Sequence, residues 1–327
     1  MLPYRSSTKL YSLAEKKMVS IKKETPPPAW AQGQVIHDLG CNRGWMASFN
    51  QDNQQAFLSN PITGRHIKLP KLGWPFPSNI ILTSSSPDAH DFRAIVTYNC
   101  KSSRIELCFP SHNRSTWLPV CNPVYYRVIA YSARQKRLFC LTSNSVECWD
   151  LESPSFLWEH PLYSEGDFKF DDSYFGRLSN HHNYLVMDEH SDRLFLVERD
   201  IYRRVGPDGS HMKYAMTGCM DYPCKTFNFK VYEIDANKGT LTKMEGSLDG
   251  LAMFVRTSNS FALPAADFNL TPDSIYFCDD YVTLRGGNDI GIFNYVDTKI
   301  SSIYYPSHPS HRGRRLAKTF WFTPNPH

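Results

Sequence analysis

Three observations on the sequence predict a single domain with an all-β fold. Aromatic residues make up 14% of the 327 residues, and most lie beside Val, Ile, Leu and Thr, which suit a pleated, half-buried surface. A pattern of strand, short polar turn and strand recurs along the chain. The 22 Pro and 17 Gly residues are scattered over the whole length, so composition marks no linker. We therefore expect one domain over residues 1–327 with very little helix.

The recurring unit is a hairpin of two short strands. Each copy alternates apolar and polar residues on both sides of a polar turn, which is the pattern of an antiparallel pair. Six copies are visible, at Leu10–Ile21, Phe57–Pro70, Ile105–Pro119, Val146–Trp158, Val231–Met244 and Ile292–Tyr304.

Further strand candidates lie between the hairpins. They add about two strands to each copy, so each repeat is expected to form a four-stranded antiparallel unit. These candidates are Ile80–Thr83, Arg93–Tyr98, Val128–Tyr131, Arg137–Thr142, Tyr184–Met187, Arg193–Val197 and Ser274–Phe277.

The spacing of the hairpins predicts a single β-propeller. The first four copies start 47, 48 and 41 residues apart, which matches the ~40–50 residue period of propeller blades. A lone four-stranded sheet cannot bury both faces, whereas radial stacking covers the faces and leaves short edges. We expect about six blades, with five to seven fitting the spacing, closed by strands from Leu10–Ile21 and Lys318–Phe322. A pair of β-sandwich domains is the alternative, and the repeating hairpin argues against it.

One interval is too long for a single blade. The fourth and fifth hairpins start 85 residues apart, which allows either two blades or one blade with an insertion. We favour a loop insertion at residues 200–226, because Gly206–Ser210 has the composition of an exposed turn.

This insertion holds the partner-binding candidates. Binding residues concentrate on loops held by a rigid scaffold, and Tyr and Arg are enriched among residues that dominate binding energy. The candidates are Tyr202, Arg203, Arg204, Tyr214 and Tyr222. A disordered insertion without a binding role is the alternative.

Charge and cysteine content narrow the functional classes. The net charge of +4 and pI near 8.5 lack the strong, clustered basicity of a nucleic-acid binder, so nucleic acid is not an expected partner. Nine cysteines at irregular spacing predict buried thiols in a reducing compartment. The sequence has no apolar run of signal-peptide or membrane-spanning length, so we expect no membrane association and a location in cytoplasm or nucleus. A transit peptide in the basic, Ser-containing residues 4–23 is the organelle alternative.

No catalytic, cofactor-binding or metal-binding residues are predicted. Glycosidase chemistry needs two carboxylates that flank a bond, but the acidic pairs Asp171-Asp172, Asp188-Glu189 and Asp279-Asp280 are adjacent and are expected in turns. We therefore expect a protein that is not an enzyme.

The metal-ligand candidates are equally incomplete. Cys219 and Cys224, with His211 upstream, supply only half of a zinc-knuckle pattern. His181-His182 and His190 are expected in polar loops. Large aromatic residues at strand positions, namely Trp45, Trp149 and Phe293, are expected in the core.

A series of short motifs runs along the chain, at Gly44–Met46, Asn60–Gly64, Lys68–Pro70, Trp149–Leu151, Phe229–Asp235, Leu248–Val255, Ser274–Asp280, Asp289–Phe293 and Trp321–Pro324. In these motifs and their order the chain resembles the plant F-box/KIB-type β-propeller family, from Leu2 to Pro324. The resemblance implies an N-terminal F-box that docks on a Skp-type adaptor of an SCF ubiquitin ligase, and a propeller that recruits the target protein. No Leu-rich amphipathic helix precedes Leu10, so no F-box is detected, and the adaptor is expected only if one lies upstream.

The function expected from the resemblance is non-catalytic protein binding, like that of the substrate-recognition domain of SCF-type F-box subunits. The bound protein is not identified by the sequence. Two alternatives stay open. One is a propeller enzyme acting on a sugar or lactone, which needs at least three acidic or His side chains converging at the channel mouth. The other is an organelle-directed relative with no ligase link.

Overall fold

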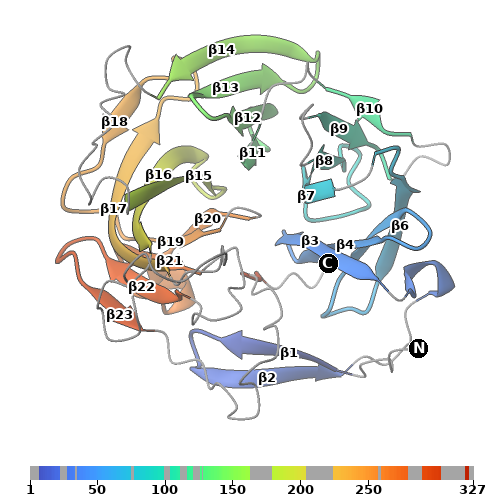
Figure 1. The fold of residues 1–327 in the computed structure, drawn as a ribbon, viewed down its shortest axis with the longest axis horizontal. Helices are drawn as coiled ribbons and strands as arrows, with labels where there is room; N and C mark the ends of the chain where they lie inside the picture. Colours follow the sequence, from blue (N-terminus) through green and yellow to red (C-terminus); the bar gives the residue numbers. More distant parts are fainter. Residues whose placement is uncertain are drawn as a thin grey trace, which may run out of the picture. The chain divides into compact units, whose positions relative to one another are not determined.

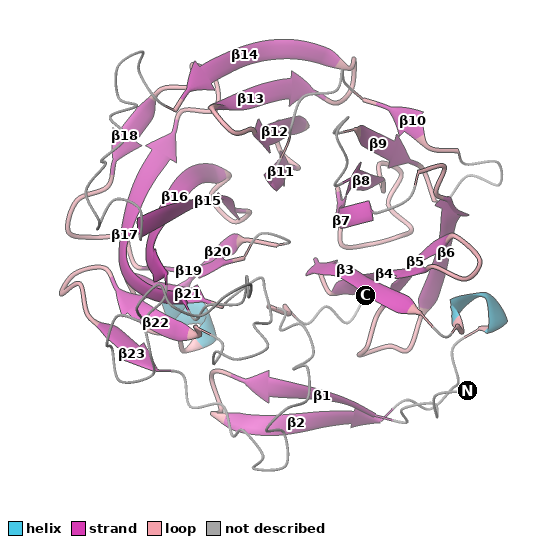
Figure 2. Ribbon diagram, in the orientation of Figure 1, coloured by secondary structure: helices cyan, strands magenta, loops and turns pink. Residues whose placement is uncertain are grey.

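The structure is a computed structural model made almost entirely of β-strands. It describes residues 7–22, 28–33, 35–74, 77–98, 104–110, 116–120, 126, 128–162, 179–203, 224–256, 259–278, 289–302 and 321–323. Within these ranges the helical elements are two single 3₁₀ turns, η1 (Ala29–Ala31) and η2 (Ala265–Phe268) (Figure 2). The expected low helix content is therefore confirmed for the described residues.

The strands follow the predicted hairpins closely. In chain order they are β1 (Ser7–Ser12), β2 (Lys17–Lys22), β3 (Ile36–Asn42), β4 (Trp45–Asn50), β5 (Gln55–Ser59), β6 (His66–Lys71), β7 (Pro77–Leu82), β8 (Ala94–Tyr98), β9 (Ile105–Cys108), β10 (Leu118–Pro119), β11 (Val128–Ser132), β12 (Arg137–Leu141), β13 (Ser145–Asp150), β14 (Ser155–Pro161), β15 (Ser179–Asp188), β16 (Arg193–Arg203), β17 (Cys224–Ile234), β18 (Leu241–Lys243), β19 (Leu251–Val255), β20 (Phe261–Pro264), β21 (Ser274–Phe277), β22 (Gly291–Asn294) and β23 (Ile300–Ser302).

Most strands join their sequence neighbours in small sheets. β1 and β2 form a two-stranded sheet, and β3–β6, β7–β10 and β11–β14 form three four-stranded sheets, each in chain order (Figure 1). Each four-stranded sheet ends in one of the predicted hairpins. The expectation of four-stranded repeats is confirmed for these three sheets.

The remaining strands form a nine-stranded sheet in which two pairs of neighbouring strands, β15 with β20 and β19 with β21, are not consecutive in the chain. β15–β18 are consecutive antiparallel strands, as in the other repeats. β19 and β20 form a hairpin, but β21 then pairs with the other side of β19 in parallel. β20 pairs in parallel with β15 over two residues and so joins the two parts of the sheet.

The chain divides into two compact units. One comprises Met1–Ser143, Glu147–Leu157 and Phe320–His327, and the other comprises Asn144–Val146 and Trp158–Thr319. The boundary passes through β13 and β14, and each unit is described by itself below.

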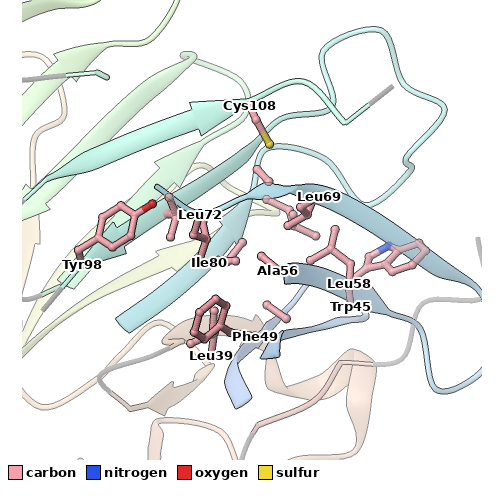
Figure 3. Packing of buried hydrophobic residues seen from close by; sticks show 14 of the residues in the cluster. Leu39, Trp45, Phe49, Ala56, Leu58, Leu69, Leu72, Ile80, Tyr98 and Cys108 are labelled. Atoms are coloured by element: carbon pink, nitrogen blue, oxygen red, sulfur yellow. The ribbon is translucent and has the colours of Figure 1, made fainter. Parts of the chain in front are cut away.

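Two apolar cores are described in the first unit. Figure 3 shows one of them, in which side chains from β3 to β9 pack together, including Leu39, Trp45, Phe49, Ala56, Leu58, Leu69, Leu72, Ile80, Tyr98 and Cys108. Trp45 is 1% exposed, and its indole N–H donates to the carbonyl of Ser85 at 3.0 Å, so burial leaves no unmet donor. The other core joins Ile81 and Ile95 to residues of β9, β11 and β12, with Trp149 packed against it.

In the second unit, one described core lies between β15–β17 and β19–β22. It contains Tyr184, Phe195, Val231, Met253 and Ile275, among others. The rings of Phe277 and Phe293 lie 5.4 and 5.2 Å from the ring of Phe229. Since Trp45 and Phe293 are both buried and Trp149 is partly buried, the three aromatic residues assigned to the core lie there.

The predicted closing strands are only partly described. The N-terminal hairpin is present as β1 and β2, with Leu10 opposite Val19. Of the C-terminal segment Lys318–Phe322, only Trp321 and Phe322 are described, and they are not in a strand. The rest of that segment lies outside the described residues.

Candidate functional site

Of the five partner-binding candidates, Tyr202 is the one with a described side chain. Arg203 is described as the last residue of β16, while Arg204, Tyr214 and Tyr222 lie outside the described residues.

The ends of the segment 200–226 are strands and not loop. β16 runs to Arg203 and β17 begins at Cys224, with Tyr202 opposite Lys225 and Arg203 opposite Cys224. Tyr, Ile, Thr and Phe at these positions favour strand pairing, which extends the ladder past the expected boundary. The loop prediction stays a prediction for residues 204–223, which lie outside the described residues.

One face of β16 is buried and the other carries polar and aromatic side chains. Arg199 and Ile201 are 1% and 2% exposed, whereas Tyr202 on the opposite face is partly exposed. Because side chains alternate along a strand, Asp200 shares the face of Tyr202. His181 of β15 is directly opposite Asp200 in the ladder.

A β-bulge in β17 adds a second aromatic ring to this face. Asp200 pairs with Asn228, but the next residue of β16, Ile201, pairs with Thr226. Phe227 is therefore the extra residue of the bulge. Bulges redirect side chains and are frequent beside functional sites. Here the bulge leaves Phe227 exposed at 37%, although its neighbour Thr226 is only 2% exposed.

Tyr202 and Phe227 stack on each other. Their ring centroids are 4.0 Å apart and their planes differ by 18°. Aromatic pairs of this kind contribute about 0.5–1.5 kcal/mol beyond the burial of their area. The stack therefore holds both rings in one arrangement before any partner binds.

A polar cluster borders the aromatic pair. His181 Nδ1 lies 2.6 Å from Asp200 Oδ1, and the Asn228 side-chain amide donates to Asp200 Oδ2 at 3.2 Å. Lys230 Nζ lies 3.7 Å from a carboxylate oxygen of Glu198 and 3.9 Å from one of Asp200. The Asp200 side chain is 6% exposed, so these partners compensate its loss of water, while the His181 side chain is 55% exposed.

We call this set of residues the aromatic face. It consists of His181, Asp200, Tyr202, Phe227, Asn228 and Lys230.

The prediction that His181 and His182 lie in a loop is wrong. Both belong to β15, whose ten residues Ser179–Asp188 pair with β16 without interruption. The pairing of His181 with Asp200 explains why a polar residue is kept in the strand. His190, by contrast, follows β15 in a turn, as expected.

The described catalytic candidates have structural contacts. Asp188 is 2% exposed and accepts hydrogen bonds from the backbone N–H of His190 at 3.0 Å and from the Ser191 hydroxyl. It therefore closes the turn after β15, as expected for an acidic residue beside a strand. Asp171, Asp172, Asp279, Asp280, His211 and Cys219 lie outside the described residues, and Cys224 is described only as a strand residue.

Burial disfavours the reactive thiolate form of Cys41 and Cys148. Burial raises the pKa of Cys41 to about 12, and burial, more than any nearby charge, raises the pKa of Cys148 to about 12. A thiol in that state holds little reactive thiolate at neutral pH. In the part of the chain that is described, no three His, Cys, Asp or Glu side chains are grouped to hold a metal ion.

The family of the chain follows from a comparison with family models. Residues 10–294 match the model described as the KIB1-4 beta-propeller. The chain belongs to this family. The match covers most of the chain, so the KIB1-4 propeller has the all-β propeller fold that its hairpins predict.

Three solved structures align with most of this chain at low sequence identity. The Cps50 (Swd1) β-propeller domain of Myceliophteria thermophila is 9% identical, with a TM-score of 0.42 over 90% of this chain and 78% of that one. AztD of Citrobacter koseri is 12% identical, with a TM-score of 0.41 over 80% and 60%. A DUF4221 family member from Bacteroides vulgatus is 10% identical, with a TM-score of 0.44 over 80% and 81%. We draw no functional argument from these likenesses.

No curated protein matches this KIB1-4 propeller by sequence. Its described residues include no helix with the length and apolar character needed to span a bilayer.

Proposed function

We propose that this KIB1-4 propeller is a non-catalytic protein-binding module that recognises its partner through the aromatic face. The observation that carries the proposal is the exposed stack of Phe227 on Tyr202, whose ring centroids are 4.0 Å apart. Aromatic side chains with a polar border are typical of the residues that dominate binding energy at protein interfaces.

Two features of the aromatic face support this role. The stacked rings are already ordered, so binding costs less side-chain entropy than it would for two mobile rings. His181, Asn228 and Lys230 form a border of hydrogen-bonding groups, and Asp200 links all three. A protein surface with an apolar pocket and polar neighbours would complement this arrangement.

The resemblance to F-box proteins supplies a more specific form of the proposal. In that form the propeller selects a target for ubiquitination, and a Skp-type adaptor binds only if an F-box is present upstream. The expected location is then the cytoplasm or nucleus. The bound protein is recognised by shape and by contacts with the aromatic face, without bond cleavage.

One observation favours a second candidate function. The 2.6 Å contact between His181 Nδ1 and the buried Asp200 resembles the arrangement that orients a histidine as a general base. A propeller enzyme acting on a sugar or lactone would use it. Turnover of such a substrate that disappears in His181→Gln would support this candidate over simple binding.

The binding proposal is tested by Phe227→Ala in the full-length chain, expressed with a tag in cells. Truncating a binding hot spot costs about 1.4 kcal/mol or more, which is tenfold in affinity. We expect at least one retained protein to fall about tenfold in quantitative mass spectrometry. Phe268→Ala is the matched control, because Phe268 is also an exposed Phe, at 49%, and lies on η2.

The proposal is wrong if wild type, Phe227→Ala and Phe268→Ala retain the same proteins in the same amounts. Equal losses in both variants would also contradict it, because the effect would then not depend on the aromatic face.

A further inference from the structure

A buried arginine lies directly behind the aromatic face. Arg199 is next to Asp200 in β16 but faces the opposite side, and it is 1% exposed. Its Nη2 lies 3.0 Å from Asp289 Oδ2, and its Nε donates to the hydroxyl of Thr226 at 2.7 Å. The guanidinium is therefore neutralised by one carboxylate and bound to the residue that precedes Phe227.

The rest of the guanidinium also contacts other residues of the second unit, to which Arg199 belongs. Nη1 donates to the Tyr184 hydroxyl at 3.4 Å and to the Cys278 carbonyl at 3.5 Å. The Phe277 ring centroid lies 4.9 Å from the guanidinium carbon. Contacts from several directions fix the position of this planar group, because its donors have a rigid geometry.

Asp289 completes the hydrogen bonding of the bulge. A bulge disrupts the ladder locally, and buried backbone N–H groups must find another acceptor. The N–H of Thr226 donates to Asp289 Oδ2 at 2.6 Å, and the hydroxyl of Thr226 donates to the same oxygen at 2.6 Å. Arg199 and Asp289 thus hold the residue immediately before Phe227 through both its backbone and its side chain.

We propose that Arg199 and Asp289 are positioning residues of the aromatic face. Their ion pair fixes Thr226, Thr226 fixes the bulge, and the bulge places Phe227 on Tyr202. The consequence for partner binding rests on the proposed function, but the consequence for the ring stack does not.

The test reads the ring stack directly by fluorine NMR. The full chain is labelled with fluorotyrosine, and the signal of Tyr202 is assigned by its absence in Tyr202→Phe. In wild type the ring current of Phe227 changes the fluorine chemical shift of Tyr202. Phe227→Ala removes this ring and gives the chemical shift of the unstacked Tyr202, which we call its unstacked position. We expect the Tyr202 signal of Asp289→Ala to move to the unstacked position.

The matched control is Asp273→Ala. Asp273 is another carboxylate of the second unit that accepts backbone hydrogen bonds, from Leu248 at 2.6 Å and Gly250 at 3.1 Å. Its loss should lower the melting temperature and leave the Tyr202 signal displaced as in wild type. A general loss of stability is thereby separated from a loss of position.

A second variant keeps the proposal testable if Asp289→Ala does not fold. Thr226→Val has the same shape but lacks the hydroxyl that bridges Arg199 and Asp289, and we expect its Tyr202 signal to move part of the way to the unstacked position. Unchanged Tyr202 signals in folded Asp289→Ala, or in Thr226→Val where the first does not fold, overturn the proposal.

The same variants distinguish this inference from the proposed function. If the Tyr202 signal moves in Asp289→Ala but the retained proteins stay as in wild type, the positioning role holds and the binding role fails. If the signal does not move, the positioning role fails whatever the retained proteins are.

Discussion

At the residue scale, single carboxylates hold turns that lie between strands. Asp273 Oδ1 accepts three hydrogen bonds, from the Ser247 hydroxyl at 2.8 Å, the Leu248 N–H at 2.6 Å and the Gly250 N–H at 3.1 Å. Burial alone would raise the pKa of Asp273, but the hydrogen bonds outweigh it, and the pKa lies below its usual value.

This lowered pKa predicts a pH-dependent contribution to stability. The folded pKa lies below the unfolded one, so the contribution is complete above about pH 4 and is lost as pH falls through the folded pKa. Asp273→Asn cannot titrate and should be less stable than wild type by about 1–3 kcal/mol near neutral pH. The difference in free energy of unfolding should shrink below about pH 4, as measured by urea unfolding from about pH 3 to 7. A difference that stays constant over this range would contradict the role of the ionised carboxylate.

Residue-scale reasoning identified only part of the aromatic face. Tyr202 was predicted because Tyr is frequent in binding hot spots; it stacks on Phe227, and its binding role stays a prediction. Phe227 was missed because strict alternation groups it with Phe229 and Val231 on the buried side. The bulge breaks that alternation, and no local residue pattern in the sequence marks it. Arg199 and Asp289 were missed because their contact spans 90 residues.

At the element scale, strands were easier to predict than their order. Ser274–Phe277 was predicted with the bounds that β21 has. Its parallel pairing with β19, on the side opposite β20, was not. Alternating polarity shows that a segment is a strand with one buried face, but it does not select which neighbouring strand pairs with it. The three four-stranded sheets follow chain order, which is why the repeat pattern described them well.

The β17–β18 hairpin provides an element-scale prediction about glycine. Gly239 has φ +72°, and a Cβ there would lie 2.7 Å from an atom of the Trp158 ring. Gly250 has φ +75° but has no atom within 4 Å of such a Cβ. The left-handed backbone costs a residue with a Cβ about 1–2 kcal/mol at both positions. Gly239→Ala should therefore lower the melting temperature more than Gly250→Ala.

The difference between these two variants isolates the contact with Trp158. The indole N–H of Trp158 donates to the carbonyl of Ala236 at 3.0 Å, so the ring is held over the turn and cannot simply move aside. Equal melting temperatures for Gly239→Ala and Gly250→Ala would mean that the ring yields without cost.

At the scale of the whole molecule, stability is distributed unevenly among the strands. β8, β12 and β19 consist largely or entirely of buried residues, whereas β10 is two exposed residues and β18 is three residues with little burial. Local opening is favoured where few apolar groups are buried. Among these five strands, amide hydrogen exchange should be faster in β18 and at Leu118 of β10 than in β8, β12 and β19. Faster exchange in β8 than in β18 would contradict this ranking.

The contact between Arg199 and Asp289 has a consequence for the timing of synthesis. A ribosome completes β16 long before it reaches Asp289, which follows Arg199 by 90 residues. A charge that is to be buried without its counter-ion is strongly unfavourable, so the nascent chain cannot settle the β17 bulge in its final form while Asp289 is untranslated. Under the proposed function, partner binding through Phe227 would thus require that Asp289 has already been translated.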